Sequence, residues 1–222
     1  MDLFRQIDAY CERTDPGFWA EPVNAATNAS FLIAALVVWA MLGGKRDPEA
    51  RVMAGFIVLI GLGSFLFHTF ATVWASIADT IPILSFIIVY IFFATRRFFD
   101  QTIWVSGAVA ICYVPFSFAL AWGLEQVVGS LNGSVGYLPV VVLMGLYALL
   151  MVPRNGETAR GLLIGAGLLG LSLVFRSIDN AICPAFPLGT HFMWHILNGV
   201  VLGWMILVLH GHETHSFQRF FR

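Results

Sequence analysis

Charged residues are scarce in this chain. Only 11% of its 222 residues are Asp, Glu, Lys or Arg, whereas 59% are hydrophobic, and the mean hydropathy is +0.82. A soluble domain carries about 25% charged and about 45–50% apolar residues, so this composition excludes an ordinary soluble protein. The net charge of −1 provides no basic surface, and no nucleic-acid partner is expected.

Cysteine is also rare. The three cysteines are Cys11, Cys112 and Cys183, of which Cys112 falls within an apolar run and the other two fall in loops. A purely structural zinc site usually has four protein ligands, often cysteines, so this distribution disfavours one. No signal peptide is visible, because residues 1–14 are polar and acidic, and the first apolar run is expected to act as its own insertion signal.

Long hydrophobic runs, by contrast, are abundant. A transmembrane helix needs about 20 mostly apolar residues, and seven stretches qualify: about 24–43, 52–70, 79–97, 103–124, 134–152, 160–176 and 189–210. Turn and charge signals separate them, and the break between the second and third is the weakest. We predict an all-α fold, a seven-transmembrane helix bundle that forms one integral-membrane domain over 1–222. Residues 1–23 are an acidic N-terminal segment, the spans occupy 24–210, and residues 211–222 are a cytoplasmic tail.

Basic residues divide unevenly between the two ends of such a bundle. Seven spans leave Arg5, Arg13 and Arg176 on the N-terminal side and the other nine of the 12 basic residues on the opposite side. Because positive residues favour the cytoplasm, the N-terminus is expected outside the cell or in a lumen, and the C-terminus in the cytoplasm.

Three histidines fall at one depth of this bundle. His191 and His195 are four positions apart at the start of the last span, so a helix places them on one face. His68 ends the second span, on the same, outer side. A lone His is more often a packing residue, but an i,i+4 pair with a third His at matching depth favours a metal ion over packing, and over haem. Three His leave a fourth position open for water, as in a catalytic zinc site.

Two further polar residues share that depth. Asp79 starts the third span, where a carboxylate can act as a general base beside a metal or can cap the helix N-terminus, and the residues alone leave both interpretations open. Ser64 lies four residues before His68 on the same helix face. It can donate to an oxyanion, or it can be a small residue at a helix contact in a glycine-rich run.

The segment before the first span is unusually acidic. Asp8, Glu12, Asp15 and Glu21 offer hard oxygen ligands for calcium, although not in an EF-hand pattern. Composition alone favours a solvated acidic tail over a calcium site.

The remaining cysteine and histidine side chains give weaker signals. Cys11 and Cys183 fall on the outer side, where disulfides persist, but separate free thiols are the alternative. His210, His212 and His215 close the chain on the other side, where we expect a solvated tail.

Taken together, these motifs resemble the alkaline ceramidase family, within the wider superfamily of seven-span hydrolases that includes the adiponectin and progestin receptors. The resemblance covers nearly the whole chain. It runs in order through Tyr10-Cys11-Glu12, Glu21-Pro22-x-Asn24-x-x-Thr27-Asn28, Gly63-Ser64-x-x-Phe67-His68, Asp79-x-x-Pro82, Ile178-Asp179-Asn180-x-x-Cys183 and His191-x-x-Trp194-His195-Ile196-Leu197. Each motif is weak alone, but their order on these spans is specific.

The resemblance implies a reaction and the residues that carry it. Members of the family hydrolyse the amide of ceramide to sphingosine and a free fatty acid. The family's zinc ligands correspond to His68, His191 and His195, and its catalytic aspartate and serine correspond to Asp79 and Ser64.

A calcium site in the N-terminal segment is also implied by the resemblance. Glu12 and Glu21 match the family's pattern. Ala9 stands where an aspartate is usual, so Asp8 and Asp15 are assigned to this site by nearness alone. A disulfide between the two outer cysteines fits the family as well.

The leading hypothesis is therefore a zinc-dependent amidase that cleaves ceramide, or a related lipid amide, within the membrane near its outer side. A receptor-like seven-span protein with a structural or residual zinc site is the alternative. A metal transporter would need ligands at several depths of the bilayer, whereas the spans carry them at one depth only.

Overall fold

The computed structural model describes residues 2–44 and 46–214 of the chain. Within this part, seven helical segments are long and apolar enough to cross a membrane, which confirms the predicted all-α, seven-span class. Within these residues there are no β-strands, and β-type pairing occurs only as an isolated bridge between Gln6 and Thr72. The chain is therefore a multi-pass membrane protein. His215 and the rest of the predicted tail over 215–222 lie outside the described residues.

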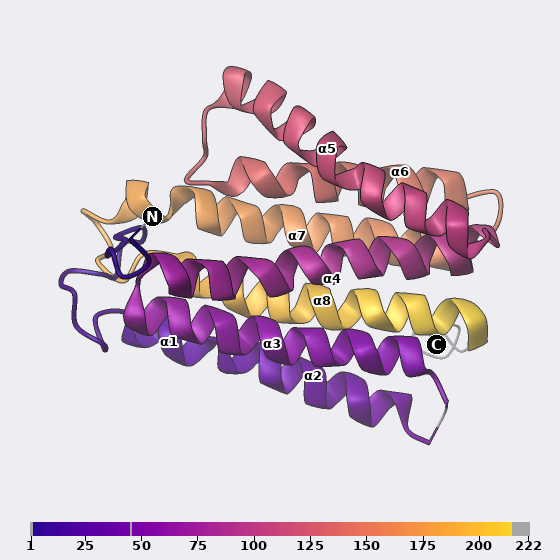
Figure 1. Ribbon diagram of the computed structural model, residues 1–222, viewed down its shortest axis with the longest axis horizontal. Helices are drawn as coiled ribbons and strands as arrows, with labels where there is room; N and C mark the ends of the chain where they lie inside the picture. Colours follow the sequence, from indigo (N-terminus) through magenta and orange to yellow (C-terminus); the bar gives the residue numbers. More distant parts are fainter. Residues whose placement is uncertain (1, 45, 215–222) are drawn as a thin grey trace.

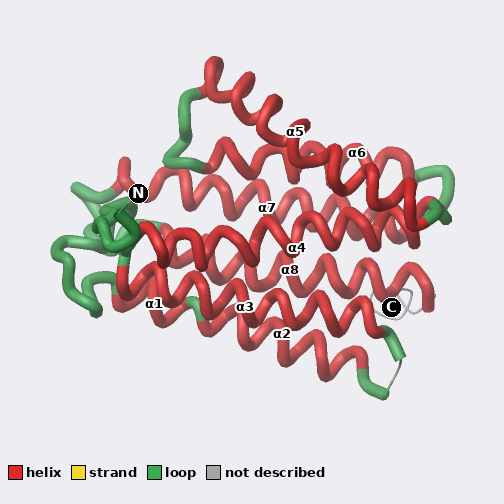
Figure 2. The backbone as a smooth tube through the Cα atoms, in the orientation of Figure 1, coloured by secondary structure: helices red, strands yellow, loops and turns green. Residues whose placement is uncertain are grey.

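The helices follow one another with short connections. They are α1 (Pro22–Thr27), α2 (Ala29–Leu42), α3 (Pro48–Phe70), α4 (Val73–Phe99), α5 (Ile103–Val128), α6 (Leu138–Met151), α7 (Gly156–Ile182) and α8 (His191–Thr214), with the short 3-10 helix η1 (Ser134–Tyr137) before α6. α1 and α2 together form the first span, and η1 and α6 form the fifth. Figure 1 shows the helices side by side along the long axis, and Figure 2 shows the connecting loops gathered mainly at the two ends.

Among the spans that are longer than the hydrophobic runs predict, α4 and α7 exceed them by the most. α4 begins at Val73, six positions before the expected start at Asp79, because only two residues separate it from α3 and the first of them, Ala71, turns the chain with a φ of +46°. α7 continues past the expected end at Arg176 to Ile182, because the polar side chains in its last turns have partners inside the protein.

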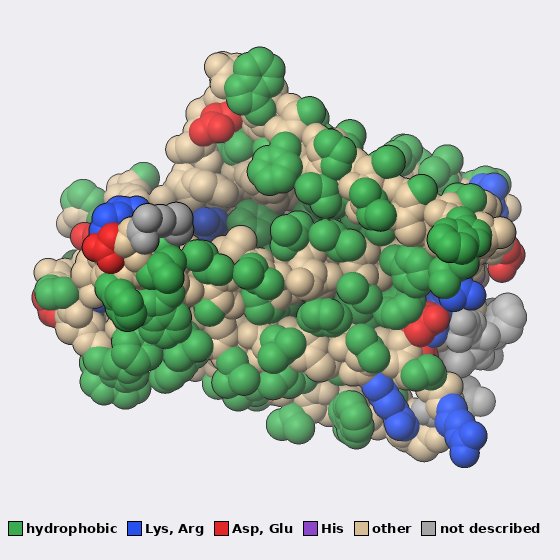
Figure 3. Space-filling view, in the orientation of Figure 1, with side chains coloured by type: hydrophobic (Ala, Val, Ile, Leu, Met, Phe, Trp, Pro, Cys, Tyr) green, Lys and Arg blue, Asp and Glu red, His purple; other side chains and the backbone are tan. Residues whose placement is uncertain are grey.

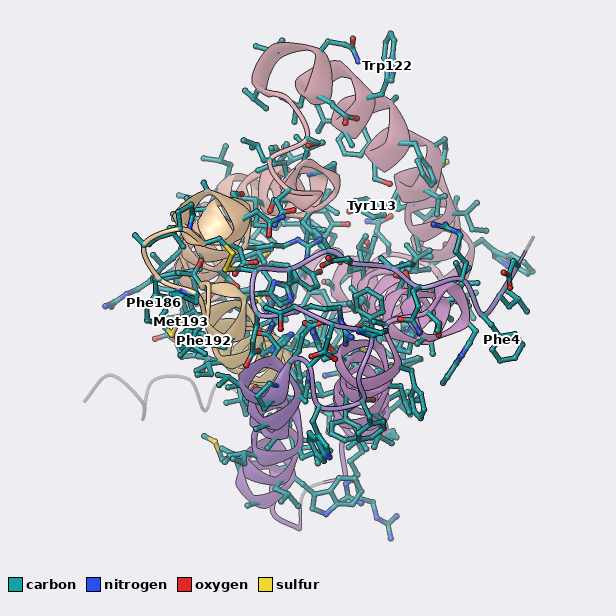
Figure 4. All side chains as sticks on the ribbon, turned by 90° about the vertical axis from the view of Figure 1, so that its left-hand side faces the viewer. Phe4, Tyr113, Trp122, Phe186, Phe192 and Met193 are labelled. Carbon is teal, nitrogen blue, oxygen red and sulfur yellow. A yellow bond between two sulfur atoms is a disulfide. The ribbon has the colours of Figure 1, made fainter. Side chains whose placement is uncertain are left out.

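The flank of the bundle is apolar. In Figure 3, hydrophobic side chains cover the visible side of the molecule and charged side chains collect mostly toward its ends, as a lipid-facing surface requires. α5 leaves its neighbours as it runs toward the end that holds the N-terminal segment (Figure 1). Trp122, which is 69% exposed, projects away from the bundle there (Figure 4). The other helices are consequently less covered by α5 at this end.

At the opposite end of the bundle, Asp47 joins three helices. Its carboxylate caps α3 by accepting from the Ala50 N–H (3.0 Å), and it also accepts from Arg97 of α4 (2.7 Å) and from His210 Nδ1 of α8 (2.7 Å). Burial alone would raise the pKa of Asp47, but these hydrogen bonds hold it well below its usual range. His210 and His212 were expected in a solvated tail. That expectation is wrong, because α8 continues through both residues and each has a partner within the bundle.

The N-terminal segment lies across the α3–α4 turn and is attached to the bundle by hydrogen bonds and a disulfide. The backbone N–H of Ile7 donates to the carbonyl oxygen of Ala71 (2.7 Å). Cys11 forms a disulfide with Cys183, just beyond α7. The structure thus decides between the two alternatives that the sequence left open, in favour of the disulfide. It attaches the segment to the loop that leads into α8.

We expect the loss of this disulfide to destabilise the protein. The two cysteines are 172 positions apart, and closing so long a loop contributes about 5 kcal/mol in the chain-entropy description, less any strain. A Cys11→Ser, Cys183→Ser double variant should therefore melt several degrees below wild type in detergent. Cys112→Ser is the matched control, because Cys112 is an exposed free thiol. A double variant that melts with the wild type would contradict this role.

Candidate metal centre

Three histidines meet at the end of the bundle that carries the N-terminal segment. His68 lies in the last turn of α3, His191 opens α8, and His195 follows one turn later. Each is about 1% exposed, and one ligand atom from each lies within 4.8 Å of the others. The predicted convergence of the i,i+4 pair with the third His is therefore present in the structure.

Glu21, the residue before α1, orients His68. Its carboxylate oxygen Oε2 lies 2.6 Å from His68 Nδ1, so that nitrogen carries the proton and donates it. Nε2 of His68 is then left with its lone pair, the form in which imidazole binds a metal. Burial alone would raise the pKa of Glu21, but hydrogen bonds from His68, Arg13 and Asn24 lower it. A carboxylate in this position is the usual outer partner of a metal-binding histidine.

Thr27, in the last turn of α1, orients His195 in the same way. Its hydroxyl lies 2.9 Å from His195 Nδ1, and it also reaches the carbonyl oxygens of Val23 (2.8 Å) and Asn24 (3.0 Å). Because the hydroxyl hydrogen is directed to those carbonyls, its oxygen accepts from Nδ1 of the histidine. His195 therefore also presents Nε2 without a proton.

Two imidazole nitrogens in this cluster have no hydrogen-bond partner among the described residues. They are His191 Nδ1 and His195 Nε2, both buried. Buried polar atoms ordinarily have a partner, and each one without a partner calls for a physical explanation. A metal ion held by three neutral imidazoles would be the partner that these two nitrogens lack. The residues present therefore fit the metal that the spacing predicts.

The start of α8 is held by Asp179 of α7. One oxygen of its buried carboxylate accepts from the N–H groups of Thr190 (2.6 Å) and His191 (2.8 Å), and the other accepts from the Cys11 N–H (2.9 Å). Gly189 turns the chain into α8 with a φ of +63°, and a side chain there would collide with Asp179. Asp179 is thus a cap that sets the position of His191, which is a structural role for a carboxylate at this depth.

Ser64 and Asp79 are brought together by an unusually close contact between α3 and α4. Pro82 has no N–H, so it cannot donate to the carbonyl of Ala78 four residues earlier. Gly63 packs directly against that carbonyl, and a Cβ there would lie 3.1 Å from the Cα of Asp79. The neighbouring Ser64 hydroxyl is consequently within hydrogen-bonding reach of the Asp79 carboxylate, and both lie near His68. The structure places Asp79 inside α4 rather than at its N-cap.

Arg176 adds a positive charge close to this cluster. Its guanidinium lies 5.3–5.5 Å from the ring centres of Tyr10, Tyr137 and Trp194, and it donates to the Tyr10 hydroxyl (2.7 Å). Tyr10 in turn stacks on His191 with ring centres 3.6 Å apart. Burial raises the pKa of Tyr10 to about 12, so its phenol remains protonated at neutral pH. The aromatic rings and the arginine close the metal centre on the side of the N-terminal segment.

An apolar cavity opens from Ser64 and Asp79 into the bundle. Its remaining wall comes from α2, α3, α4, α6, α7, α8 and η1, and no residue of the fully described α5 contributes to it. The wall includes Ile83, Phe86, Tyr90, Val140, Leu143, Met144, Tyr147, Leu162, Leu169, Asn198, Val201 and Met205. On α4 the lining residues run from Asp79 to Ile91, about 18 Å of helix rise. Ser64 and Asp79 lie at one end of it, and mostly apolar side chains line the rest.

The acidic residues assigned to calcium do not gather into one site. Glu12 caps α1, because its two oxygens accept from the N–H groups of Val23 (2.7 Å) and Asn24 (2.8 Å). Asp8 and Asp15 are exposed, and Glu21 faces His68. The calcium site remains a prediction, and these residues do not fit it as an assembled set of ligands.

Several residues of the site had no role assigned from the sequence. Tyr10 and Thr27 were parts of motifs, but a motif does not say which side chain its residues contact. Arg13 and Arg176 were counted only as basic residues of the outer side. Each of these four residues has a contact at least 55 positions away in the chain, which no local spacing could have identified.

The fold and the site together define a multi-pass membrane protein with a candidate metal centre at the mouth of an apolar cavity. The sequence matches the family model Ceramidase over residues 10–219, nearly the whole chain. The chain therefore belongs to the ceramidase family, and membership implies a hydrolase that acts on ceramide, a lipid amide. A comparison with curated proteins finds no match.

Removal of the Glu21 charge should weaken the metal centre while leaving its three histidines in place. Loss of an outer partner of a metal-binding histidine typically reduces affinity about 10–100-fold. We expect that reduction for Glu21→Gln, measured by competition with a chromophoric chelator. Asp8→Asn is the control, since Asp8 is an exposed acid of the same segment. Equal affinities in the two variants would contradict the role given to Glu21.

Proposed function

We propose that this protein is a zinc-dependent intramembrane hydrolase that cleaves the amide bond of ceramide to give sphingosine and a fatty acid. The observation that carries the proposal is the position of the three histidines beside Ser64 and Asp79, at the polar end of an apolar cavity. An amphipathic lipid amide has the matching shape, with its polar amide at one end of a hydrocarbon chain.

His68, His191 and His195 would hold the metal through neutral imidazole nitrogens, the donor type that suits zinc. Three protein ligands are typical of catalytic rather than structural zinc. When bound, the ion supplies a Lewis acid and lowers the pKa of coordinated water. Glu21 keeps the imidazole of His68, and Thr27 that of His195, in the tautomer that metal binding requires.

Asp79 is the proposed proton carrier. Amide hydrolysis needs a base that takes a proton from the attacking water and an acid that gives a proton to the departing amine, because an unprotonated amine leaves poorly. A single carboxylate can do both in turn, accepting first and donating afterwards, so that water and amide yield a carboxylic acid and an amine. Its closeness to His68 and Ser64 supports this role.

Ser64 is proposed to donate its hydroxyl hydrogen to the carbonyl oxygen of the scissile amide, on which negative charge develops. Such a donor is effective when it is held in advance within a site that excludes water. Ser64 is 4% exposed and lies on the cavity wall, which supports this assignment. The short contact at Gly63 restricts where the hydroxyl can be.

The cavity is proposed to receive one hydrocarbon chain of the substrate. The stretch of α4 that lines it is about 18 Å long, comparable with half the roughly 30 Å hydrocarbon core, the depth that the chains of one leaflet occupy. α4 and α6 line the cavity and α5 does not, and α5 diverges from the bundle at the same end (Figure 1). Because α5 does not cover the cavity at this end, we expect the lipid to enter from the membrane between α4 and α6.

The location of the site at the outer or lumenal face of the membrane also remains a proposal. It rests on the distribution of basic residues, which favours a cytoplasmic location for the opposite end.

Asp79→Asn should retain metal and fold yet lose nearly all ceramide hydrolysis. Loss of general acid–base catalysis costs about 10²–10⁴-fold, and loss of one oxyanion donor about 10²–10³-fold, so Ser64→Ala should also keep metal but lose less. The measurement is mass spectrometry of fatty acid and sphingosine released by each purified variant, with metal content determined alongside. Wild-type turnover by Asp79→Asn would disprove the assigned role, and absence of product from metal-loaded wild type would disprove the proposed function.

Filling the cavity should change which ceramides are cleaved. Met144 lines the cavity, so Met144→Trp is expected to lower turnover of long-chain ceramides at least tenfold while short-chain ceramides are still cleaved. Val142→Trp is the matched control, because Val142 is 48% exposed on the same helix and is not on the cavity wall. Equal losses for short and long chains in the Met144 variant, or the same shift in the control, would count against this binding mode.

A further inference from the structure

Arg13 is a buried arginine in the N-terminal segment. It is 7% exposed, and its Nε donates to Oε1 of Glu21 (2.6 Å). The two terminal nitrogens donate to three backbone carbonyl oxygens, those of Asp15 (3.1 Å), Gly17 (3.4 Å) and His68 (3.0 Å). The guanidinium therefore stands where the N-terminal segment, the start of α1 and the end of α3 meet.

The oxygens around this guanidinium are of the kind that a hard cation takes. Ca²⁺ is bound by about six to eight oxygens from carboxylates, backbone carbonyls and water. Here a carboxylate and three carbonyls already surround a positive group. A calcium ion added to the same oxygens would lie against the guanidinium, and the repulsion between two cations is strong in a buried site.

Glu21 uses both of its oxygens in this arrangement. Oε1 accepts from Arg13, and Oε2 accepts from His68 Nδ1 and from the Asn24 side chain (3.1 Å). The positive charge of Arg13 thus balances the negative charge of the Glu21 carboxylate. Glu12, the other acid that matched the calcium pattern, is occupied in capping α1.

We infer that Arg13 takes the place of the calcium ion that the family resemblance implies, and that it is a built-in cation which positions the metal centre. Arg13 holds the Glu21 carboxylate, and Glu21 holds His68 with Nε2 toward the other two histidines. Arg13 also binds the carbonyl of His68 itself, at the end of α3. The inference rests on the proposed metal site but does not depend on the ceramide reaction.

The first test measures the response of the wild-type chain to calcium. Protein purified in detergent is melted with millimolar Ca²⁺, with Mg²⁺ as the ionic control, and with a calcium-selective chelator. A ligand that binds the folded state raises its stability by mass action, so we expect the same melting temperature in all three conditions. A rise with Ca²⁺ and a fall with the chelator would overturn the inference.

The second test measures zinc affinity by competition with a chromophoric chelator. Arg13→Ala should weaken zinc binding about 10–100-fold, as loss of outer support for a ligand usually does. Arg13→Lys should lie between, because an ammonium keeps the charge but lacks the planar fork that serves a carboxylate and three carbonyls together. Arg5→Ala is the matched control, since Arg5 is an exposed arginine of the same segment, and should bind zinc as wild type does.

These outcomes separate positioning from a merely structural contribution. A lower melting temperature with wild-type zinc affinity in Arg13→Ala would show that Arg13 only stabilises the fold and would overturn the inference. If Arg13→Ala does not fold, Arg13→Lys carries the comparison. Failure of the wild type to bind zinc would be a failure of the proposed function, and it leaves the calcium measurement valid by itself.

Discussion

One buried carboxylate, that of Glu21, connects the parts of this protein on which the candidate site depends. It joins Arg13 of the N-terminal segment to His68 at the end of α3, and it does so from the residue that precedes α1. Ionisable groups within a membrane protein are costly unless they have partners. The segment outside the spans therefore takes part in the site, because it supplies Arg13, whose positive charge pairs with the Glu21 carboxylate beside His68.

A second constraint comes from backbone contact between α3 and α4. Pro82 removes one helix hydrogen bond and leaves the Ala78 carbonyl available, and Gly63 has no side chain to keep α3 away from it. The contact sets the spacing between Ser64 and Asp79 more tightly than side-chain packing would. Two motifs that are separate in the chain, one around Ser64 and one around Asp79, thus describe the two sides of a single contact.

The division of polar and apolar surface inside the bundle follows the division of the membrane. Polar groups and the disulfide lie at one end, where water and lipid headgroups are near, and the cavity continues from them along hydrocarbon side chains. In the proposed binding mode, a lipid amide lies in the protein much as it lies in a leaflet, with its polar amide at the end of a hydrocarbon chain. Such an arrangement avoids moving the chain through water before the reaction.

The sequence by itself determined the seven spans, the class of fold and the three histidines of the candidate metal centre, because hydrophobic length and i,i+4 spacing are local properties that a helix converts directly into position. It also placed Ser64 and Asp79 at the depth of the three histidines, and Cys11 and Cys183 on one side of the bundle. Only the tertiary structure decided that Cys11 and Cys183 are bonded, that His210 and His212 belong to α8, and that α4 begins before Asp79. Above all, it decided the surroundings of Glu21: an acid that the sequence assigned to calcium faces an arginine and a histidine, because side chains from distant parts of the chain meet only after the helices have packed.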